Sequence, residues 1–286
     1  MAHTTSKMLR YTALSFAAWA ATPAHALELL VPGYFYPSTH VAQWQSLVET
    51  AQQQPLSVII NPNSGPGSTV NSDYQAVIAD LHAAGATLYG YVSTAWGTRD
   101  LSAVTADLDA FNSMYDIDGF FLDEMATGTN MLGHYSEISD HITDISPALR
   151  TIANPGTTAD EGYLALFDTL VAYESSAAAL GSHTPASYQR NYTADRFAQL
   201  VYGANEATMQ SLVNQAAANN YGYILVTDID GAGAWEGLPG YWTSEAAAVQ
   251  AVSTVPEPGS VALFVSGLAL VAGISLRRQP GQTRTA

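Results

Sequence analysis

The strongest constraint on the fold is a regular alternation of two kinds of segment. Short apolar runs typical of strands alternate with longer stretches in which apolar residues recur at helical spacing. The spacing is clearest at Tyr74, Val77, Ile78 and Leu81, which would share one face of a helix, and Gly85 follows as a stop signal. Strict alternation of this kind predicts parallel strands joined by helical crossovers.

The alternation divides the chain into repeated strand and helix units. Expected strands cover residues 29–36, 57–61, 87–93, 119–123, 150–154, 170–174, 196–202 and 221–228. Helical spacing is found in residues 41–48, 74–81, 101–111, 135–142, 209–216 and 244–252. Eight strands within about 230 residues match an α/β fold of the (β/α)8 TIM-type barrel class, as a single domain. An open doubly wound sheet is the alternative, but no Gly-rich phosphate loop follows the first strand, which ends at Gly33–Pro37.

The N-terminal residues 1–26 have the pattern of a signal peptide. Lys7 and Arg10 precede an apolar segment, and Ala24-His25-Ala26 fits a small-x-small cleavage site. The apolar segment is shorter than the roughly 20 residues of a membrane-spanning helix. We therefore expect signal peptidase to cleave after Ala26; the alternative is a buried N-terminal helix.

The C-terminal residues 255–286 form a tripartite tail. Pro256-Glu257-Pro258 precedes an apolar run about long enough to span a membrane, which Arg277-Arg278 follow. This tail resembles the PEP-CTERM sorting signal. The resemblance implies transient membrane insertion, recognition by an exosortase, removal of the tail and release to the cell surface or extracellular matrix. A plain C-terminal anchor is the alternative, which would leave the protein on the membrane. Residues 27–254 would then form the barrel.

Composition excludes two classes of function for the segment between these ends. The chain has 9 basic and 25 acidic residues and no cysteine. Between the ends only Arg99, Arg150, Arg190 and Arg196 are basic. A nucleic-acid partner is therefore not expected, because phosphate binding needs clustered Lys and Arg. Chemistry based on a thiol is excluded. The acidic charge is compatible with a neutral or cationic polymer, and it would also keep an exported protein soluble.

Polar and aromatic residues gather where the expected strands end. In a barrel these ends meet at one face, where the active sites of such enzymes lie. Carboxylates, amides and aromatic rings are the groups that bind sugars, and two carboxyl groups can cleave a glycosidic bond. The residues are Tyr34, Tyr36, Asn61, Tyr91, Trp96, Asp123, Glu124, Asn154, Tyr173, Glu174, Tyr202 and Asp228. We predict catalytic roles for Asp123, Glu124 and Glu174 and substrate binding for the others.

The three acids differ in the role that their position predicts. Side chains alternate along a strand, so Asp123 is expected to face the pocket while Glu124 is turned in by the loop or supports the site from behind. Strands four and six lie roughly 10 Å apart, and two inward side chains can reduce this to the ~5–5.5 Å of a retaining glycosidase pair. We therefore predict Asp123 as nucleophile and Glu174 as general acid/base. One of Asp123 and Glu124 could instead cap a helix, and Glu174 could be only a substrate ligand or a salt-bridge partner.

No metal or cofactor is expected. Residues 116–119 and 228–231 resemble fragments of calcium loops, but both lack the downstream ligands of a complete loop. Trp235 lies in a glycine-rich stretch after the eighth strand, where it could serve as a sugar platform or simply pack.

Several motifs together resemble the spherulation-specific family 4 (spherulin-4-like) proteins, over roughly residues 29–230. They are residues 31–37 (VPGYFYP), 60–67 (INPNSGPG), 90–92 (GYV), 119–124 (GFFLDE), 154–156 (NPG) and 173–174 (YE). Fungal members are classed as glycoside hydrolase family 135. The resemblance implies a (β/α)8 fold and endo-acting hydrolysis of α-1,4-linked N-acetylgalactosamine polymers, with essential acids that match Asp123, Glu124 and Glu174. A non-catalytic carbohydrate-binding protein and a glycosidase of other specificity are the competing interpretations.

Overall fold

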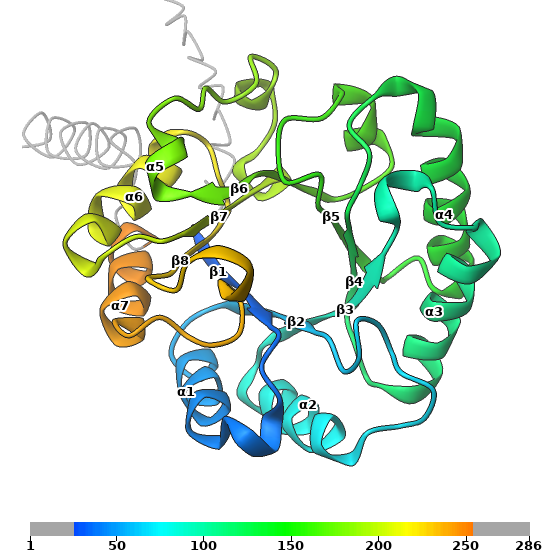
Figure 1. Ribbon diagram of the computed structural model, residues 1–286, viewed down its shortest axis with the longest axis horizontal. Coiled ribbons are helices and arrows are strands. Elements are labelled where there is room, and N and C mark those ends of the chain that lie inside the picture. Colours follow the sequence, from blue (N-terminus) through cyan, green and yellow to red (C-terminus); the bar gives the residue numbers. More distant parts are fainter. Residues whose placement is uncertain (1–25, 254–286) are drawn as a thin grey trace, which may run out of the picture. The chain divides into compact units, whose positions relative to one another are not determined.

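The computed structural model describes residues 26–253, which form one compact unit around a closed parallel barrel. The strands follow one another in chain order, and β8 pairs with β1 to close the sheet (Figure 1). They are β1 (Glu28–Gly33), β2 (Leu56–Ile60), β3 (Thr87–Ser93), β4 (Gly119–Asp123), β5 (Arg150–Ala153), β6 (Thr169–Ser176), β7 (Phe197–Tyr202) and β8 (Tyr223–Val226). The predicted single-domain TIM-type barrel is confirmed.

Helices surround the barrel as an outer layer (Figure 1). The helices are α1 (Val41–Ala51), α2 (Ser72–Ala84), α3 (Leu101–Met114), α4 (Leu132–Ile145), α5 (Ala177–Leu180), α6 (Glu206–Ala218) and α7 (Trp242–Ser253). The crossover from β5 to β6 has only a 3-10 helix, η4 (Glu161–Ala165), and α5 is a single turn. The barrel therefore departs from strict alternation at the two crossovers where the sequence shows no helical spacing.

The first strand is shorter than predicted. It ends at Gly33 rather than Tyr36, because Gly33 pairs with Ile60, the last residue of β2, and the chain then has no neighbouring ladder to join. Pro37 begins a 3-10 turn, η1 (Pro37–Thr39). Tyr34 and Tyr36 consequently lie on the loop at the barrel mouth rather than in the sheet.

Polar side chains lie at the N-terminal end of the barrel, opposite the mouth. Glu28 accepts a hydrogen bond from the Ser57 hydroxyl at 2.6 Å, and Tyr89 forms a hydrogen bond with Arg150. The backbones of β4 and β5 also approach closely here, since a Cβ on Gly119 would stand 2.2 Å from the carbonyl oxygen of Arg150.

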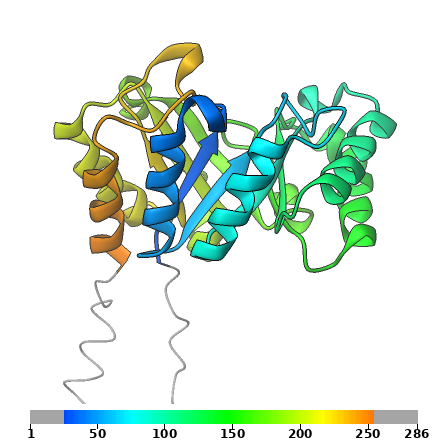
Figure 2. The same cartoon turned by 90° about the horizontal axis from the view of Figure 1, so that it is seen from below.

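The ends of the described chain and the long loop after β8 lie at opposite faces of the barrel. Figure 2 shows the described chain beginning and ending at the N-terminal face, where the Ser253 hydroxyl donates to the Leu27 carbonyl at 2.6 Å. The loop after β8, residues 227–241, rises above the opposite face (gold in Figure 2). The predicted signal peptide and sorting tail lie outside the described residues. Within residues 26–253, no helix is long and apolar enough to cross a membrane.

Candidate active site

Asp123 and Glu174 are bridged by one amide at the barrel mouth. The Asn154 Nδ2 atom donates to Asp123 Oδ1 at 2.7 Å and to Glu174 Oε2 at 2.5 Å. The two bonds together hold these oxygens closer than the ~6.5–9.5 Å gap of an inverting carboxylate pair. Asn154 is itself fixed, because its Oδ1 accepts from the backbone N–H of Gly156 at 2.8 Å.

Glu174 has a second partner that comes from the far side of the barrel. The indole Nε1–H of Trp235 donates to Glu174 Oε1 at 2.8 Å. Trp235 belongs to the loop after β8, and its ring meets the Tyr202 ring edge-on, with centroids 6.2 Å apart. Both oxygens of Glu174 therefore accept a hydrogen bond from a neutral donor.

Two tyrosines form the wall beside Asp123. Tyr91 donates its hydroxyl to the Asp123 carboxyl group, and its ring meets Tyr34 edge-on at 5.5 Å. Burial, together with the charges of Asp123 and Glu174, raises the pKa of Tyr34 well above its usual range. Burial and the same carboxylates also raise the pKa of Tyr91. Both phenols thus remain protonated and can donate hydrogen bonds.

Glu124 breaks the alternation of β4. Its φ of 53° lies in the left-handed region, where a side chain is strained. This turn directs the Glu124 backbone N–H to the Asp123 carboxyl group, while Glu124 Oε2 accepts from the Ser93 hydroxyl at 2.5 Å. Two successive acids are thereby held at one strand end with different hydrogen-bond partners.

The neighbouring loop after β3 holds this strained turn. The Thr94 hydroxyl lies 3.0 Å from the Asp123 carbonyl oxygen and 2.8 Å from that of Glu124, and Trp96 N–H donates to the Glu124 carbonyl at 2.6 Å. Tyr135 of α4 lies behind, with its hydroxyl 2.7 Å from that of Thr94. Ala95 and Trp96 are also left-handed, with φ of 46° and 54°.

Burial favours the protonated form of both bridged acids. It raises the pKa of Asp123, against three donors: Tyr91, the Glu124 backbone and Asn154. It likewise raises the pKa of Glu174, against two donors, Asn154 and Trp235, while the charge of Asp123 raises it further. Donors favour the ionised form, so these hydrogen bonds oppose the effect of burial on both carboxyl groups.

The structure brings together only part of the predicted set. Tyr34, Tyr91, Asp123, Asn154, Glu174 and Tyr202 lie around the bridged pair, and Glu124 lies beside it. Asp228 is exposed, and its Oδ1 accepts from Gly240 N–H at 3.0 Å within the loop after β8. Asn61 directs its side chain to Gly65 N–H at 2.9 Å, so it shapes the loop after β2.

Three predicted aromatic residues lie away from the bridged pair. Tyr173 packs on His183, with ring centroids 4.6 Å apart, and its hydroxyl donates to the Ser176 carbonyl. Trp96 is 61% exposed on the loop after β3. Tyr36 is exposed and contacts Asn71 at the start of α2.

Sequence reasoning missed part of the support around the acids. Trp235 was considered as a sugar platform, and its role as a donor to Glu174 depends on a loop with no periodic pattern. Thr94 binds the Glu124 carbonyl from a loop, and Tyr135 contacts Thr94 from a helix, so spacing gives no signal for either residue. Ser93 ends β3 opposite Asp123, so its position at a strand end does mark it.

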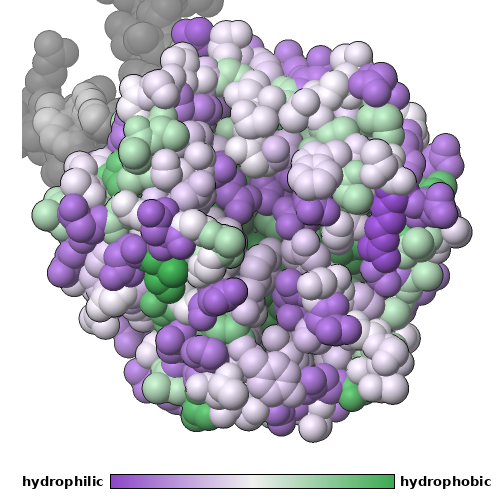
Figure 3. Space-filling view, in the orientation of Figure 1, coloured by the Kyte–Doolittle hydropathy of each residue, from purple (hydrophilic) through white to green (hydrophobic). Residues whose placement is uncertain are grey.

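The central face is hollow and polar. Figure 3 shows a depression over the barrel axis, rimmed by hydrophilic residues. Among the residues that the structure describes, no group of three or more His, Asp or Glu side chains could hold a metal ion. A closed β/α barrel with paired carboxyl groups at its C-terminal face is the arrangement found in glycoside hydrolases of this fold.

Comparison with known proteins places the chain in a family. The family model described as spherulation-specific family 4 matches residues 28–249, and the chain belongs to this family. Spherulin-4 of Physarum polycephalum is 31% identical over 258 residues, covering 86% of this chain and 77% of that protein. A model of the PEP-CTERM protein-sorting motif matches residues 254–279, which indicates export and surface association through exosortase-dependent sorting.

Solved structures show the same fold. Aspergillus clavatus Sph3, solved in complex with GalNAc, superposes with a TM-score of 0.70 at 21% identity, covering 80% of this chain and 99% of that one. The catalytic domain of a chitinase from Pyrococcus furiosus gives 0.50 at 10% identity, covering 82% and 99%. Both structures thus share the barrel fold of this chain.

Proposed function

We propose that the protein is an exported, endo-acting and retaining glycoside hydrolase. The observation that carries the proposal is the pair Asp123 and Glu174, bridged by one Asn154 amide. The distance suits a covalent mechanism, since a water molecule for direct attack would need a wider gap between the two carboxyl groups, ~6.5–9.5 Å.

In the first step Glu174 donates its proton to the glycosidic oxygen while an Asp123 oxygen attacks the anomeric carbon. The bond to the leaving sugar breaks and a glycosyl ester of Asp123 forms. Because burial raises the pKa of Glu174, this carboxyl group keeps its proton to higher pH than an ordinary glutamate, as a general acid requires. In the second step Glu174 accepts a proton from water, whose oxygen attacks the anomeric carbon and releases Asp123.

The other groups at the mouth orient this pair. Tyr91 and the Glu124 backbone hold the Asp123 carboxylate in one rotamer. Glu124, hydrogen-bonded to Ser93, is available to bind a substrate hydroxyl or amide. Tyr34 and Tyr202 offer aromatic surface for the sugar ring, since apolar sugar faces stack on such rings.

The proposed substrate is an exopolysaccharide of α-1,4-linked N-acetylgalactosamine and galactosamine. Membership of the spherulation-specific family supports it, as does the GalNAc bound to the structurally similar Sph3. The match to the sorting motif supports a location at the cell surface or in the extracellular matrix.

The test measures reducing-end release from α-1,4-galactosaminan, with the anomer of the product read by NMR. We expect the retained anomer for the wild type and a loss of at least about 1000-fold for Asp123→Asn. Asp116→Asn, an exposed acid at the opposite face, is the matched control and should retain activity. Inverted product would contradict Asp123 as nucleophile, and polymer binding without turnover would identify a non-catalytic lectin.

A further inference from the structure

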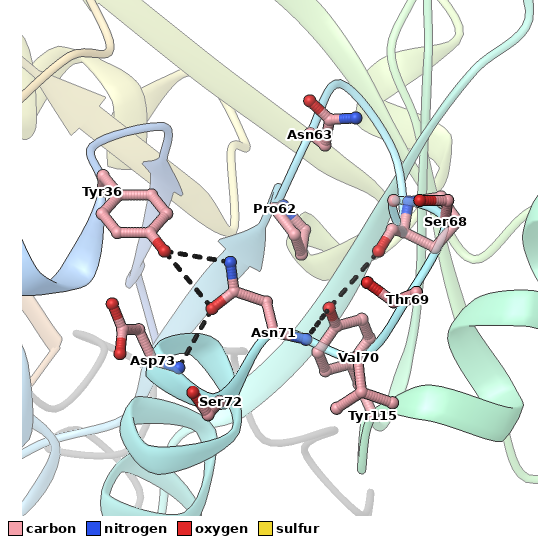
Figure 4. A pocket seen from close by; sticks show the side chains of 12 residues that line it. Tyr36, Pro62, Asn63, Ser68, Thr69, Val70, Asn71, Ser72, Asp73 and Tyr115 are labelled. Atoms are coloured by element: carbon pink, nitrogen blue, oxygen red, sulfur yellow. Dashed lines mark hydrogen bonds between the residues drawn. The ribbon is translucent and has the colours of Figure 1, made fainter.

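A second cavity lies beside the barrel mouth, outside the bridged acids. It occupies about 550 Å³ between the segment after β1 and the loop from β2 to α2 (Figure 4). Tyr36 forms one wall, Tyr115 lies at its base, and residues 66–73 curve around it. This cavity has no part in the cleavage chemistry proposed above.

The walls of this cavity are fixed by a chain of hydrogen bonds. The Asn71 side chain donates to the Tyr36 hydroxyl at 3.0 Å and accepts from the Asp73 N–H at 3.0 Å (Figure 4). The Asn71 N–H donates to the Tyr115 hydroxyl at 3.1 Å, which in turn donates to the Pro66 carbonyl. The cavity is therefore built before any ligand arrives, which lowers the entropic cost of binding.

Five polar side chains in the lining have no hydrogen-bond partner within the described part of the chain. They are Asn63, Ser68, Thr69, Ser72 and Asp73. Amide, hydroxyl and carboxylate groups spaced along a concave wall match the hydroxyls of a sugar unit. Tyr36, 39% exposed with its hydroxyl held by Asn71, adds an aromatic surface.

The charge of the lining selects among sugar units. Asp73 is its one charged residue, and no Lys, Arg or His lines the cavity. An anionic sugar such as a uronic acid is thereby disfavoured. An amino sugar with a free ammonium group can form a charge-assisted hydrogen bond with Asp73.

The cavity is continuous in sequence with the proposed active site. Tyr36 is two residues beyond Tyr34, which interacts with Asp123 and Glu174. In an extended chain two residues advance the backbone by roughly 7 Å. A polymer cleaved at the barrel mouth can thus continue over the Tyr34–Tyr36 segment into the cavity.

We propose that this cavity is a distal subsite for a hexosamine unit with a free amino group, beyond the two sugars that flank the cleaved bond. The inference rests on the proposed function and deepens it. It explains how an endo-acting enzyme would prefer partly deacetylated polymer over the fully acetylated form. Asp73 recognises the ammonium group, and Asn63 and the hydroxyl side chains bind the ring hydroxyls.

Asp73→Asn and Asn63→Ala test the subsite, and Asp80→Asn is the matched control. Asp80 lies on the same helix but is exposed outside the cavity, so its substitution removes the same charge. We expect Asp73→Asn to raise KM for partly deacetylated polymer about 5-fold at low salt, the worth of one exposed charged contact of about 1 kcal/mol. The increase should be smaller for a trisaccharide and smaller for fully acetylated polymer.

Binding to a variant without turnover separates this proposal from the proposed function. Partly deacetylated galactosamine oligomers are titrated into Asp123→Asn with and without Asp73→Asn, and NMR shifts are recorded for residues 62–73. Binding that weakens with Asp73→Asn supports the subsite, even if the wild type cleaves nothing and the glycosidase proposal fails. If the wild type cleaves the polymer but neither cavity variant changes KM or the NMR shifts, the subsite is ruled out while the proposed glycosidase function stands.

Discussion

The substitution Trp235→Phe distinguishes whether the indole acts as a hydrogen-bond donor to Glu174 or only as an aromatic surface for a sugar. Phenylalanine keeps an aromatic surface for a sugar but removes the Nε1–H that donates to Glu174 at 2.8 Å. A hydrogen bond to a buried charged group contributes about 1.5–3 kcal/mol, and one pH unit corresponds to about 1.4 kcal/mol. The Asn154 bond to Glu174 remains, so we take the lower end of this range.

The direction of the pKa shift of Glu174 follows from the protonation state that the Trp235 hydrogen bond stabilises. The Trp235 donor favours the ionised carboxylate and so lowers the pKa of Glu174; its loss raises that pKa. Glu174 as general acid then stays protonated to higher pH. We expect the alkaline limb of the kcat/KM profile to move up by about one pH unit in Trp235→Phe.

The assay is reducing-end release at a series of pH values, for the wild type, Trp235→Phe and Trp242→Phe. Trp242 is the control, because its indole donates to Thr50 at 3.1 Å between α7 and α1, away from the mouth. An alkaline limb that does not move, or moves down, would refute the assignment of Glu174 as the general acid held by Trp235. A raised KM with an unchanged profile would identify Trp235 as a platform only.

Three further predictions concern two residues of the site and one buried acid of α7. Asn154→Ala should lower kcat about 100–1000-fold, because both bridged carboxyl groups lose their shared donor; steady-state kinetics test this. Glu124→Gly should relieve the left-handed strain, raising the free energy of unfolding by about 1 kcal/mol in urea melts while activity falls. Glu245 is fully buried and accepts a hydrogen bond from the Val226 N–H, and burial raises its pKa well above that of an ordinary glutamate. The unfolded chain therefore releases this proton first, and wild-type stability should fall as pH rises from the ordinary glutamate pKa toward the raised one. Glu245→Gln should remove this fall and stabilise the protein at pH 8 by about 1–2 kcal/mol, as read from urea midpoints at pH 5 and pH 8.

The fold could be predicted because its pattern is local. The strand residues 87–93 and 119–123 were predicted with their observed bounds, since apolar runs buried on both faces end abruptly at polar residues. The crossover from β5 to β6 could not be predicted as a helix, because Pro155 and Gly156 open it and no apolar spacing follows. The length of β1 depends on where β2 stops, which is a property of the pairing and not of β1 itself.

The site was predictable only as far as strand ends determine it. Asp123, Asn154 and Glu174 were found because parallel strands end at a common face, and the structure brings them together. Tyr173 was included because it also ends a strand, yet the alternation that turns Glu174 inward turns Tyr173 toward His183. Trp235 crosses the barrel mouth from a loop, and only the folded chain shows that contact.

The strained backbone at Glu124 ties the acids to the loop after β3. A regular strand would direct Asp123 and Glu124 to opposite faces, so one acid would be lost to the site. The left-handed turn avoids this at a cost of order 1–3 kcal/mol, and it persists because Thr94 and the Trp96 N–H bind the carbonyl groups of the turn. Trp96, itself left-handed and exposed, is therefore coupled to the geometry of the acids through the backbone. A substitution that lets this loop relax should reduce catalysis even where it removes no contact with the sugar.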